Sequence, residues 1–180
     1  MKKTTLVLAL VFAAGAVFAQ KKTTSSATVS FDAATPKDAL PKAENKTVIG
    51  SLDTQTGAVA FEAAVANFSF SNPKMQEHFN GANWMNSAQF PKFTYTGTIA
   101  KVNKVKFTKN GTYNVKVDGT MTVKGVSKPA KVEGTITVAD GKIKVAANFT
   151  IKLKDFGITG QPIEAGKVKE EPSISVSAEF

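Results

Sequence analysis

The feature that most constrains the fold is an alternation of apolar and polar residues through the C-terminal half of the chain. In Tyr113–Val123, every second residue is apolar or glycine, and the residues between them are polar or charged. A period of two is typical of a β-strand with one buried face. The C-terminal half is therefore predicted to be a series of strands, with the same period at residues 93–101, 104–108, 129–138, 142–154 and 173–180.

Short turn sequences join these segments. Asn110-Gly111 and Asp140-Gly141 are dipeptides that favour tight hairpin turns. Further strands are expected at residues 28–33, 47–53 and 58–71. Consecutive hairpins with about eight strands in all predict an all-β protein, either an antiparallel barrel or a strongly curved sandwich.

Small residues interrupt the predicted inward face of the strands. Gly97, Gly119, Gly134 and Ala147 each occupy a position where the alternation places an inward side chain. Two interpretations are open. Small residues let strands coil so that a barrel can close, or they leave room for a ligand in a barrel just wide enough to hold one small molecule.

A non-alternating insert at residues 72–93 contains the only histidine and the only tryptophan of the chain. Asn72 is a good N-cap and Pro73 suits the first helical position, so a short helix is predicted at residues 73–80. The end of a barrel with an apolar interior needs a cover that is apolar on its inner side. We expect the insert to be this cap, either a lid that contacts a ligand or a fixed plug of ordinary core. Its expected contact residues are Met75, His78, Phe79, Trp84 and Met85.

The N-terminus has the pattern of a secretory signal. Two lysines precede an apolar run from Leu6 to Val17, and a small residue, Ala19, completes the pattern of a cleavage site. The apolar run is shorter than the roughly 20 residues of a membrane span. We expect residues 1–19 to be a signal peptide, residues 20–27 to be a flexible leader, and residues 28–180 to form one barrel domain.

Composition argues against several functions. All 23 basic residues are lysines, against 14 acidic residues. Because arginine, which supplies bidentate contacts to phosphates and bases, is missing, we expect no nucleic-acid partner, although a weak contact with an anionic membrane surface is compatible with the charge. With no cysteine and one histidine, a metal site of the usual nitrogen and sulfur ligands cannot be built. The chain has neither a nucleophile-elbow motif nor a glycine-rich phosphate loop, so we expect no enzyme activity and no cofactor.

Four separated motifs resemble those of the YceI-like family. They are "MQEHF" at Met75–Phe79, "NWMNSAQFP" at Asn83–Pro91, "GTMTVKGVSK" at Gly119–Lys128 and "LKDFGI" at Leu153–Ile158. The resemblance implies an eight-stranded, lipocalin-like antiparallel barrel, exported to the periplasm, whose apolar lumen binds long isoprenoid lipids such as polyisoprenoid quinones. Two positions depart from the family pattern, since Met75 replaces an arginine and Lys124 replaces a histidine. The choice of head group is therefore open.

We accordingly expect an exported barrel, monomeric or weakly dimeric, that holds a long-chain isoprenoid or a similar amphiphile for carriage or storage. A ligand-free barrel that serves as an interaction or stress-related module is the alternative. A lipid-modifying enzyme would need two polar groups that converge in the lumen, for which Tyr95 and His78 are the obvious candidates. The expected lumen residues are Phe61, Phe68, Phe70, Phe93, Tyr95, Gly97, Val117, Gly119, Met121, Gly134, Ile136, Ala147 and Phe149.

Overall fold

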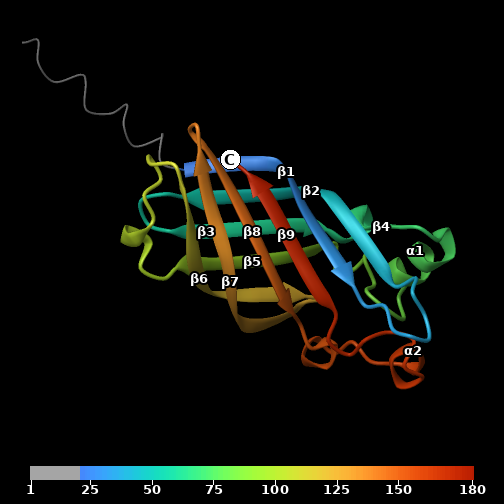
Figure 1. Ribbon diagram of the computed structural model, residues 1–180. Helices are drawn as coiled ribbons and strands as arrows, with labels where there is room; N and C mark the ends of the chain where they lie inside the picture. The colour runs from blue at the N-terminus through green and yellow to red at the C-terminus, as the bar shows by residue number, and fades with distance from the viewer. Residues whose placement is uncertain (1–20) are drawn as a thin grey trace, which may run out of the picture.

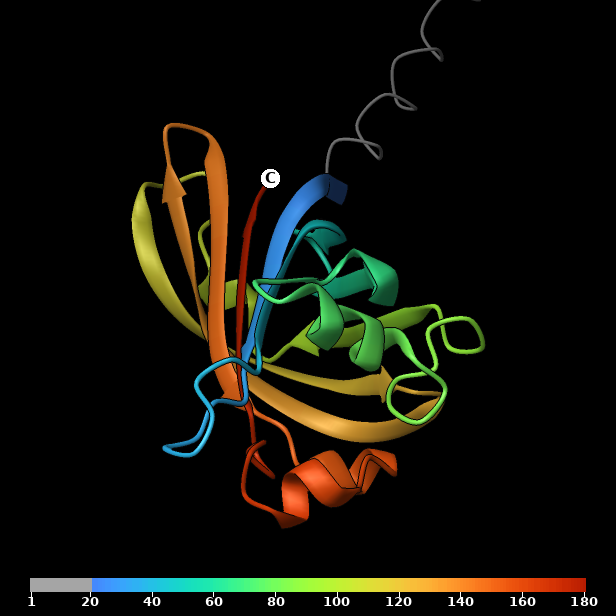
Figure 2. The ribbon, with the colours of Figure 1, turned by 90° about the vertical axis from the view of Figure 1, so that its right-hand side faces the viewer.

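Eight long antiparallel strands close into a barrel in the computed structural model, which describes residues 21–180 (Figures 1 and 2). The closure is direct, because the first strand pairs on one side with the second and on the other side with the last. A two-residue strand, β4 (Ser69–Phe70), adds to the edge of β2. The eight barrel strands are β1 (Lys21–Asp32), β2 (Lys42–Asp53), β3 (Ala58–Ala64), β5 (Lys92–Ile99), β6 (Gly111–Val123), β7 (Val126–Ala139), β8 (Lys142–Thr150) and β9 (Ser173–Glu179). The eight-stranded antiparallel barrel expected from the sequence is confirmed.

Tight turns set the register of the long C-terminal strands. Asp140 and Gly141 join β7 to β8 with φ values of 51° and 80°, as a hairpin turn with two left-handed residues requires. Lys124 and Gly125 join β6 to β7 in the same way, with φ values of 50° and 76°. Lys124, one of the two positions that depart from the family pattern, therefore lies in a hairpin turn.

The flexible leader expected at residues 20–27 is wrong for the part that the structure describes. Residues 21–27 belong to β1, where Lys21 pairs with Asp53 and Thr24 pairs with Gly50 of β2. Their polar side chains give no sequence signal for a buried face, but they pair with β2 through backbone hydrogen bonds that any of these residues can make. Gln20 and the expected signal peptide lie outside the described residues.

Three other predicted strands are absent, shortened or split where the chain turns to cover an end of the barrel. Residues 104–108 are not a strand, since the 3₁₀-helix η2 (Val102–Lys104) precedes a loop in which Val105 is buried. After β8 the chain enters the 3₁₀-helix η3 (Leu153–Phe156) instead of continuing as a strand. The segment predicted at residues 58–71 is likewise split into β3, the 3₁₀-helix η1 (Val65–Asn67) and β4. Alternating residues at these places cover the interior without a strand partner.

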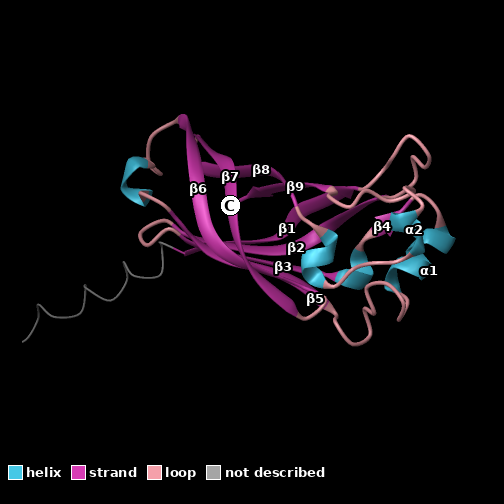
Figure 3. Cartoon of the chain, turned by 90° about the horizontal axis from the view of Figure 1, so that it is seen from below, coloured by secondary structure: helices cyan, strands magenta, loops and turns pink. Residues whose placement is uncertain are grey.

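The predicted helix is confirmed as α1 (Pro73–Asn80), and the Asn72 side chain accepts a hydrogen bond from the Lys74 backbone N–H at 2.9 Å. Figure 3 shows α1 and α2 (Gln161–Glu164) at one end of the barrel and η2 at the other. We call these the cap end and the closed end. Among residues 21–180, no helix is long and apolar enough to cross a membrane.

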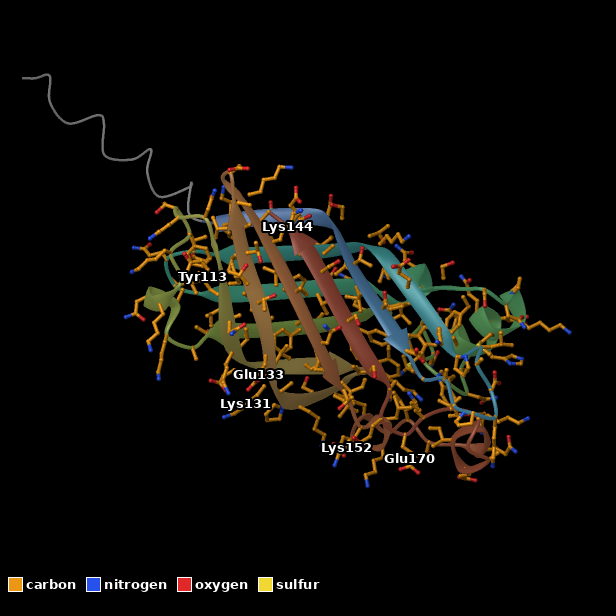
Figure 4. All side chains as sticks on the ribbon, viewed as in Figure 1. Tyr113, Lys131, Glu133, Lys144, Lys152 and Glu170 are labelled. Atoms are coloured by element: carbon orange, nitrogen blue, oxygen red, sulfur yellow. The ribbon has the colours of Figure 1, made fainter. Side chains whose placement is uncertain are left out.

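The interior is packed as two clusters that correspond to the two ends. The cap-end cluster includes Phe68, Phe79 and Met85. The closed-end cluster consists of Leu52, Ile99, Val105, Val115, Ile136, Val138 and Ile143. Charged side chains of the wall, such as Lys131, Glu133 and Lys144, point away from the barrel (Figure 4).

Candidate functional site: an apolar cavity inside the barrel

An apolar cavity of about 200 Å³ lies inside the barrel. Side chains from both packed clusters line it, among them Phe79 and Phe68 toward the cap end and Ile99 and Ile136 toward the closed end. Among the described residues that line it, none carries a charge. The cavity is therefore suited to hydrocarbon.

The half-buried inward residues of β8 and β9 show where the barrel is hollow. Val145 and Phe149 of β8 and Val176 of β9 face the cavity, yet each remains partly accessible. At the closed end, by contrast, Ile143 is only 2% exposed and Ile136 only 1%. The hollow is thus bounded by β8 and β9 and ends on a packed apolar floor.

Most of the expected lumen residues line this cavity. They are Phe61, Phe68, Phe93, Tyr95, Val117, Met121, Gly134, Ile136, Ala147 and Phe149. Phe70, Gly97 and Gly119 do not line it. Phe70 instead packs in the cap-end cluster, with its ring centroid 5.0 Å from that of Phe79 and 5.7 Å from that of Phe31.

The interpretation that the glycines make room for a ligand is wrong for Gly97 and Gly119. These residues pair directly across β5 and β6. A Cβ atom on Gly97 would lie 2.8 Å from the Asp118 carbonyl oxygen, and one on Gly119 would lie 2.7 Å from the ring of Tyr95. Backbone and side-chain atoms already occupy the space, so these glycines permit close approach of neighbouring strands, which is the closure interpretation.

Gly134 combines both roles. It lines the cavity, but a Cβ atom there would lie 2.5 Å from the Ala146 carbonyl oxygen of β8. Ala147, on the neighbouring strand, lines the cavity as well and is half-buried. The small residues Gly134 and Ala147 therefore border the cavity. Glycine is required at position 134 because the neighbouring strand β8 lies too close for a Cβ atom.

Phe79, Trp84 and Met85 of the expected cap line the cavity, whereas Met75 and His78 do not. Phe79 is 5% exposed and stacks on Phe31, with centroids 5.7 Å apart and ring planes at 18°. His78 is exposed, one position before Phe79 on α1 and therefore on a different face of that helix. A polar pair of His78 and Tyr95 inside the lumen is excluded by this arrangement.

The one tyrosine of the lining has its hydroxyl engaged. Tyr95 Oη lies 3.2 Å from the Val117 carbonyl oxygen and 3.2 Å from the Ala130 carbonyl oxygen, and it donates its proton to one of them at a time. Burial raises the pKa of this phenol, and the negative charge of Asp118 raises it further. Tyr95 thus remains neutral and anchors the wall.

Several lining residues were not predicted as site residues. Phe31 of β1 and Ile174 and Val176 of β9 line the cavity. The alternation of apolar and polar residues in these strands could have predicted them, because each occupies an inward position. Ile158 and Val168 also line it, but they lie in the irregular segment after η3. No periodicity in that segment points to them.

Residues 21–180 contain no group of three His, Cys, Asp or Glu side chains that could hold a metal ion. The acids of the strands instead form ion pairs on the outer surface, such as Glu62 with Lys92 at 2.8 Å. The cavity therefore offers shape and apolar contact, and we identify no chemistry for it beyond binding.

The YceI-like domain model matches residues 12–180 of the chain. The chain belongs to the YceI-like family. Among sequence relatives, a UPF0312 protein of Yersinia enterocolitica is 29% identical over 115 residues, which cover 61% of this chain and 54% of that protein. A UPF0312 protein of Yersinia pseudotuberculosis is 30% identical over the same length. The matched region thus spans about half the length of these relatives.

Solved structures of YceI-like and related proteins share the fold. A polyisoprenoid-binding domain from Saccharophagus degradans superimposes with a TM-score of 0.75 at 10% identity, covering 89% of this chain and 97% of that domain. BcnA of Burkholderia cenocepacia gives a TM-score of 0.70 at 18% identity, covering 86% of this chain and 96% of BcnA. The YCEI protein of Campylobacter jejuni gives 0.59 at 20% identity, covering 74% of this chain and 78% of that protein. At these identities the likeness concerns the fold alone.

Proposed function

We propose that this protein binds one long-chain isoprenoid or a similar amphiphile, with the apolar chain inside the barrel, and carries or stores it. The observation that supports this most directly is the cavity of about 200 Å³, whose lining includes no charged side chain among residues 21–180. One solved relative with the same fold is a polyisoprenoid-binding domain. The signal pattern at residues 1–19 favours export, and we place the protein in the periplasm.

The free energy of an empty cavity favours an occupant. At roughly 24 cal/mol per Å³, a void of this size would cost about 5 kcal/mol when dry and enclosed, which is comparable to the net stability of about 5–15 kcal/mol of a whole domain. An apolar chain that enters the cavity gains about 0.8 kcal/mol for each methylene group removed from water. Filling the cavity with a hydrocarbon chain is therefore favourable.

The polar head group of the ligand would lie at the cap end. The closed end is filled by Leu52, Ile136 and Ile143, each at most 2% exposed, whereas Trp84 at the cap end lines the cavity and is only half-buried. We therefore infer that a chain enters from the cap end. Met75 and Lys124, the positions that depart from the family pattern, both lie toward the cap end, in α1 and in the β6–β7 turn. Head-group preference is therefore expected to differ from that of relatives, while preference for an apolar chain is retained.

The test is extraction of protein purified from its native compartment with organic solvent, followed by mass spectrometry. We expect one amphiphile with a long apolar chain per protein molecule. Trp84 is the only tryptophan of the chain and lines the cavity, so added isoprenoids should change its fluorescence in delipidated protein. An extract without lipid, together with no response of Trp84 to isoprenoids, would overturn the proposal.

A further inference from the structure

The closed end of the barrel carries four lysines that have no acidic partner. They belong to residues 100–110, the connection between β5 and β6, which we call the lysine loop. All four side chains are exposed, and no acidic residue occurs within the loop. None of the ion pairs formed among residues 21–180 includes any of them. The four are Lys101, Lys104, Lys106 and Lys109.

Lysines of the barrel wall are in a different electrostatic situation. Lys131 lies 3.4 Å from Asp118, and Lys142 and Lys144 lie 2.9 Å and 3.5 Å from Glu179. Lys116 pairs with Glu133 on the neighbouring strand. These four wall lysines are compensated, and Lys131, Glu133 and Lys144 lie on the outer surface of the barrel in Figure 4. Among residues 21–180, lysines without an ion pair also occur elsewhere, such as Lys128 on β7, but the lysine loop gathers four of them in one connection of a chain whose formal net charge is +9.

The loop is ordered by its apolar side chains and by Tyr113. Val105 is 7% exposed in the closed-end cluster, and Phe107 packs against that cluster. The Tyr113 hydroxyl lies 3.3 Å from the Lys106 carbonyl oxygen and 3.2 Å from the Lys109 carbonyl oxygen. Because the backbone is already fixed, little backbone conformational entropy is lost when the lysines contact a partner.

We propose that the lysine loop docks the barrel on an anionic phospholipid surface. A lysine ammonium is a compact point charge without the planar fork of arginine, so a lysine cluster suits a mobile array of lipid phosphates better than directional recognition of nucleic-acid bases. Phe107, half-buried beside the lysines, adds an apolar ring of the kind that accompanies basic residues in segments bound at membrane surfaces. An acidic protein is the competing class of partner.

Docking by this surface fixes the orientation of the barrel. The lysine loop lies at the end opposite α1 and α2, so the cap end faces away from the lipid surface (Figure 3). The closed end of the barrel would contact the membrane. The cap end would remain accessible to a second partner or a second membrane. This proposal does not depend on what the cavity binds.

The experiment is sedimentation of the full chain with vesicles of phosphatidylcholine, with and without phosphatidylglycerol. One variant replaces the four lysines of the loop by glutamine. A matched variant replaces Lys42, Lys92, Lys128 and Lys131 by glutamine, which removes the same charge from exposed wall positions nearer the cap end. Circular dichroism checks that both variants fold.

We expect binding only to the anionic vesicles, weakened by salt because exposed charges are screened within about 10 Å at 0.1 M ionic strength. The loop variant should lose roughly a hundredfold to a thousandfold in partition coefficient, since each lysine near an anionic surface contributes on the order of 1 kcal/mol, while the wall variant should lose less than roughly tenfold. Equal losses in the two variants would overturn the proposal in favour of a net-charge effect. No binding to anionic vesicles, with salt-sensitive binding to polyglutamate, would instead assign the loop to an acidic protein.

Discussion

The ring of Tyr95 on β5 lies directly against Gly119 on β6, so that a Cβ atom at Gly119 would come within 2.7 Å of both Cζ and the hydroxyl oxygen of Tyr95. Tyr95 pairs with Met121 and reaches diagonally across the glycine, and its hydroxyl ends beside the carbonyl oxygens of Val117 and Ala130. The aromatic ring covers the place where a side chain is missing. The wall is thus continuous at this point, and the cavity is bordered here by Tyr95 and not by Gly119.

Replacement of Gly119 by alanine should destabilise the barrel. The new methyl group would collide with the Thr96 carbonyl oxygen and with the ring of Tyr95, and overpacking of this kind costs about 1–3 kcal/mol. Gly81→Ala is the matched control, because Gly81 has a φ of −63° and a Cβ atom there would come no closer than 3.3 Å to its neighbours. Urea unfolding measures both. A Gly119→Ala variant as stable as the control would contradict the packing described for Tyr95.

Tyr95→Phe should change how stability depends on pH above neutrality. The raised pKa of Tyr95 in the folded state means that the unfolded chain loses its phenolic proton first as pH rises, so stability falls above pH ~10. Tyr95→Phe removes this loss, at a cost of about 1 kcal/mol at neutral pH for the missing hydrogen bond.

Unfolding free energies of the wild type and of Tyr95→Phe are measured from pH 7 to pH 11. Both proteins carry the same lysines, so a difference in slope between the two curves comes from position 95. We expect the curve of Tyr95→Phe to decline less steeply than that of the wild type. Parallel curves would show that the phenol of Tyr95 does not titrate differently in the folded and unfolded states.

Val176→Phe should weaken binding of a long-chain isoprenoid by roughly tenfold or more, since a difference of about 1.4 kcal/mol corresponds to that factor. Val176 lines the cavity on β9 and is half-buried, so a larger side chain there fills space that the ligand would use. Filling the hollow should leave the free energy of unfolding unchanged or raise it by about 0.5–2 kcal/mol. Ser177→Phe, one residue along the same strand with its side chain exposed, should bind as the wild type does.

The fluorescence of Trp84 reports binding in both of these variants, because neither adds a tryptophan. Unchanged affinity in Val176→Phe would show that the ligand does not occupy the hollow along β9. Loss of affinity in both variants would point to a surface effect.

Phe79→Ala should destabilise the protein by about 3 kcal/mol, because it removes a buried ring from the cap-end cluster and leaves a void. The ring of Phe79 contacts those of Phe31, Phe70 and Phe68, with centroid distances of 5.7, 5.0 and 5.9 Å. Met75→Ala, one turn earlier on α1 at a half-buried position outside this cluster, should cost about 1 kcal/mol or less. Thermal unfolding of the two variants separates these effects, and equal losses would show that α1 is held equally by both residues.

Much of the fold followed from local patterns. The period of two assigned the inward rows of β6 to β9, and ten of the thirteen expected lumen residues line the cavity. Asn72 and Pro73 defined the start of α1, and Asp140-Gly141 defined a hairpin. These features depend on backbone preferences of a few neighbouring residues, which the sequence contains in full.

Contacts between distant segments decided the rest. Residues 21–27 became strand because they extend β1 along β2, and their own side chains gave no sign of it. Residues 104–108 alternate as a strand would, yet they plug the closed end because no strand lies beside them to pair with.

The sequence alone determined that the strands turn an apolar face inward and that a short helix interrupts them. Only the tertiary structure decided where that interior is empty. Gly119 and Val176 both stand at inward positions, but the glycine is covered by Tyr95 while the valine borders the cavity. The empty volume next to an inward residue depends on which side chain lies opposite it inside the barrel. Sheet curvature and strand register determine that side chain, and neighbours in the chain do not.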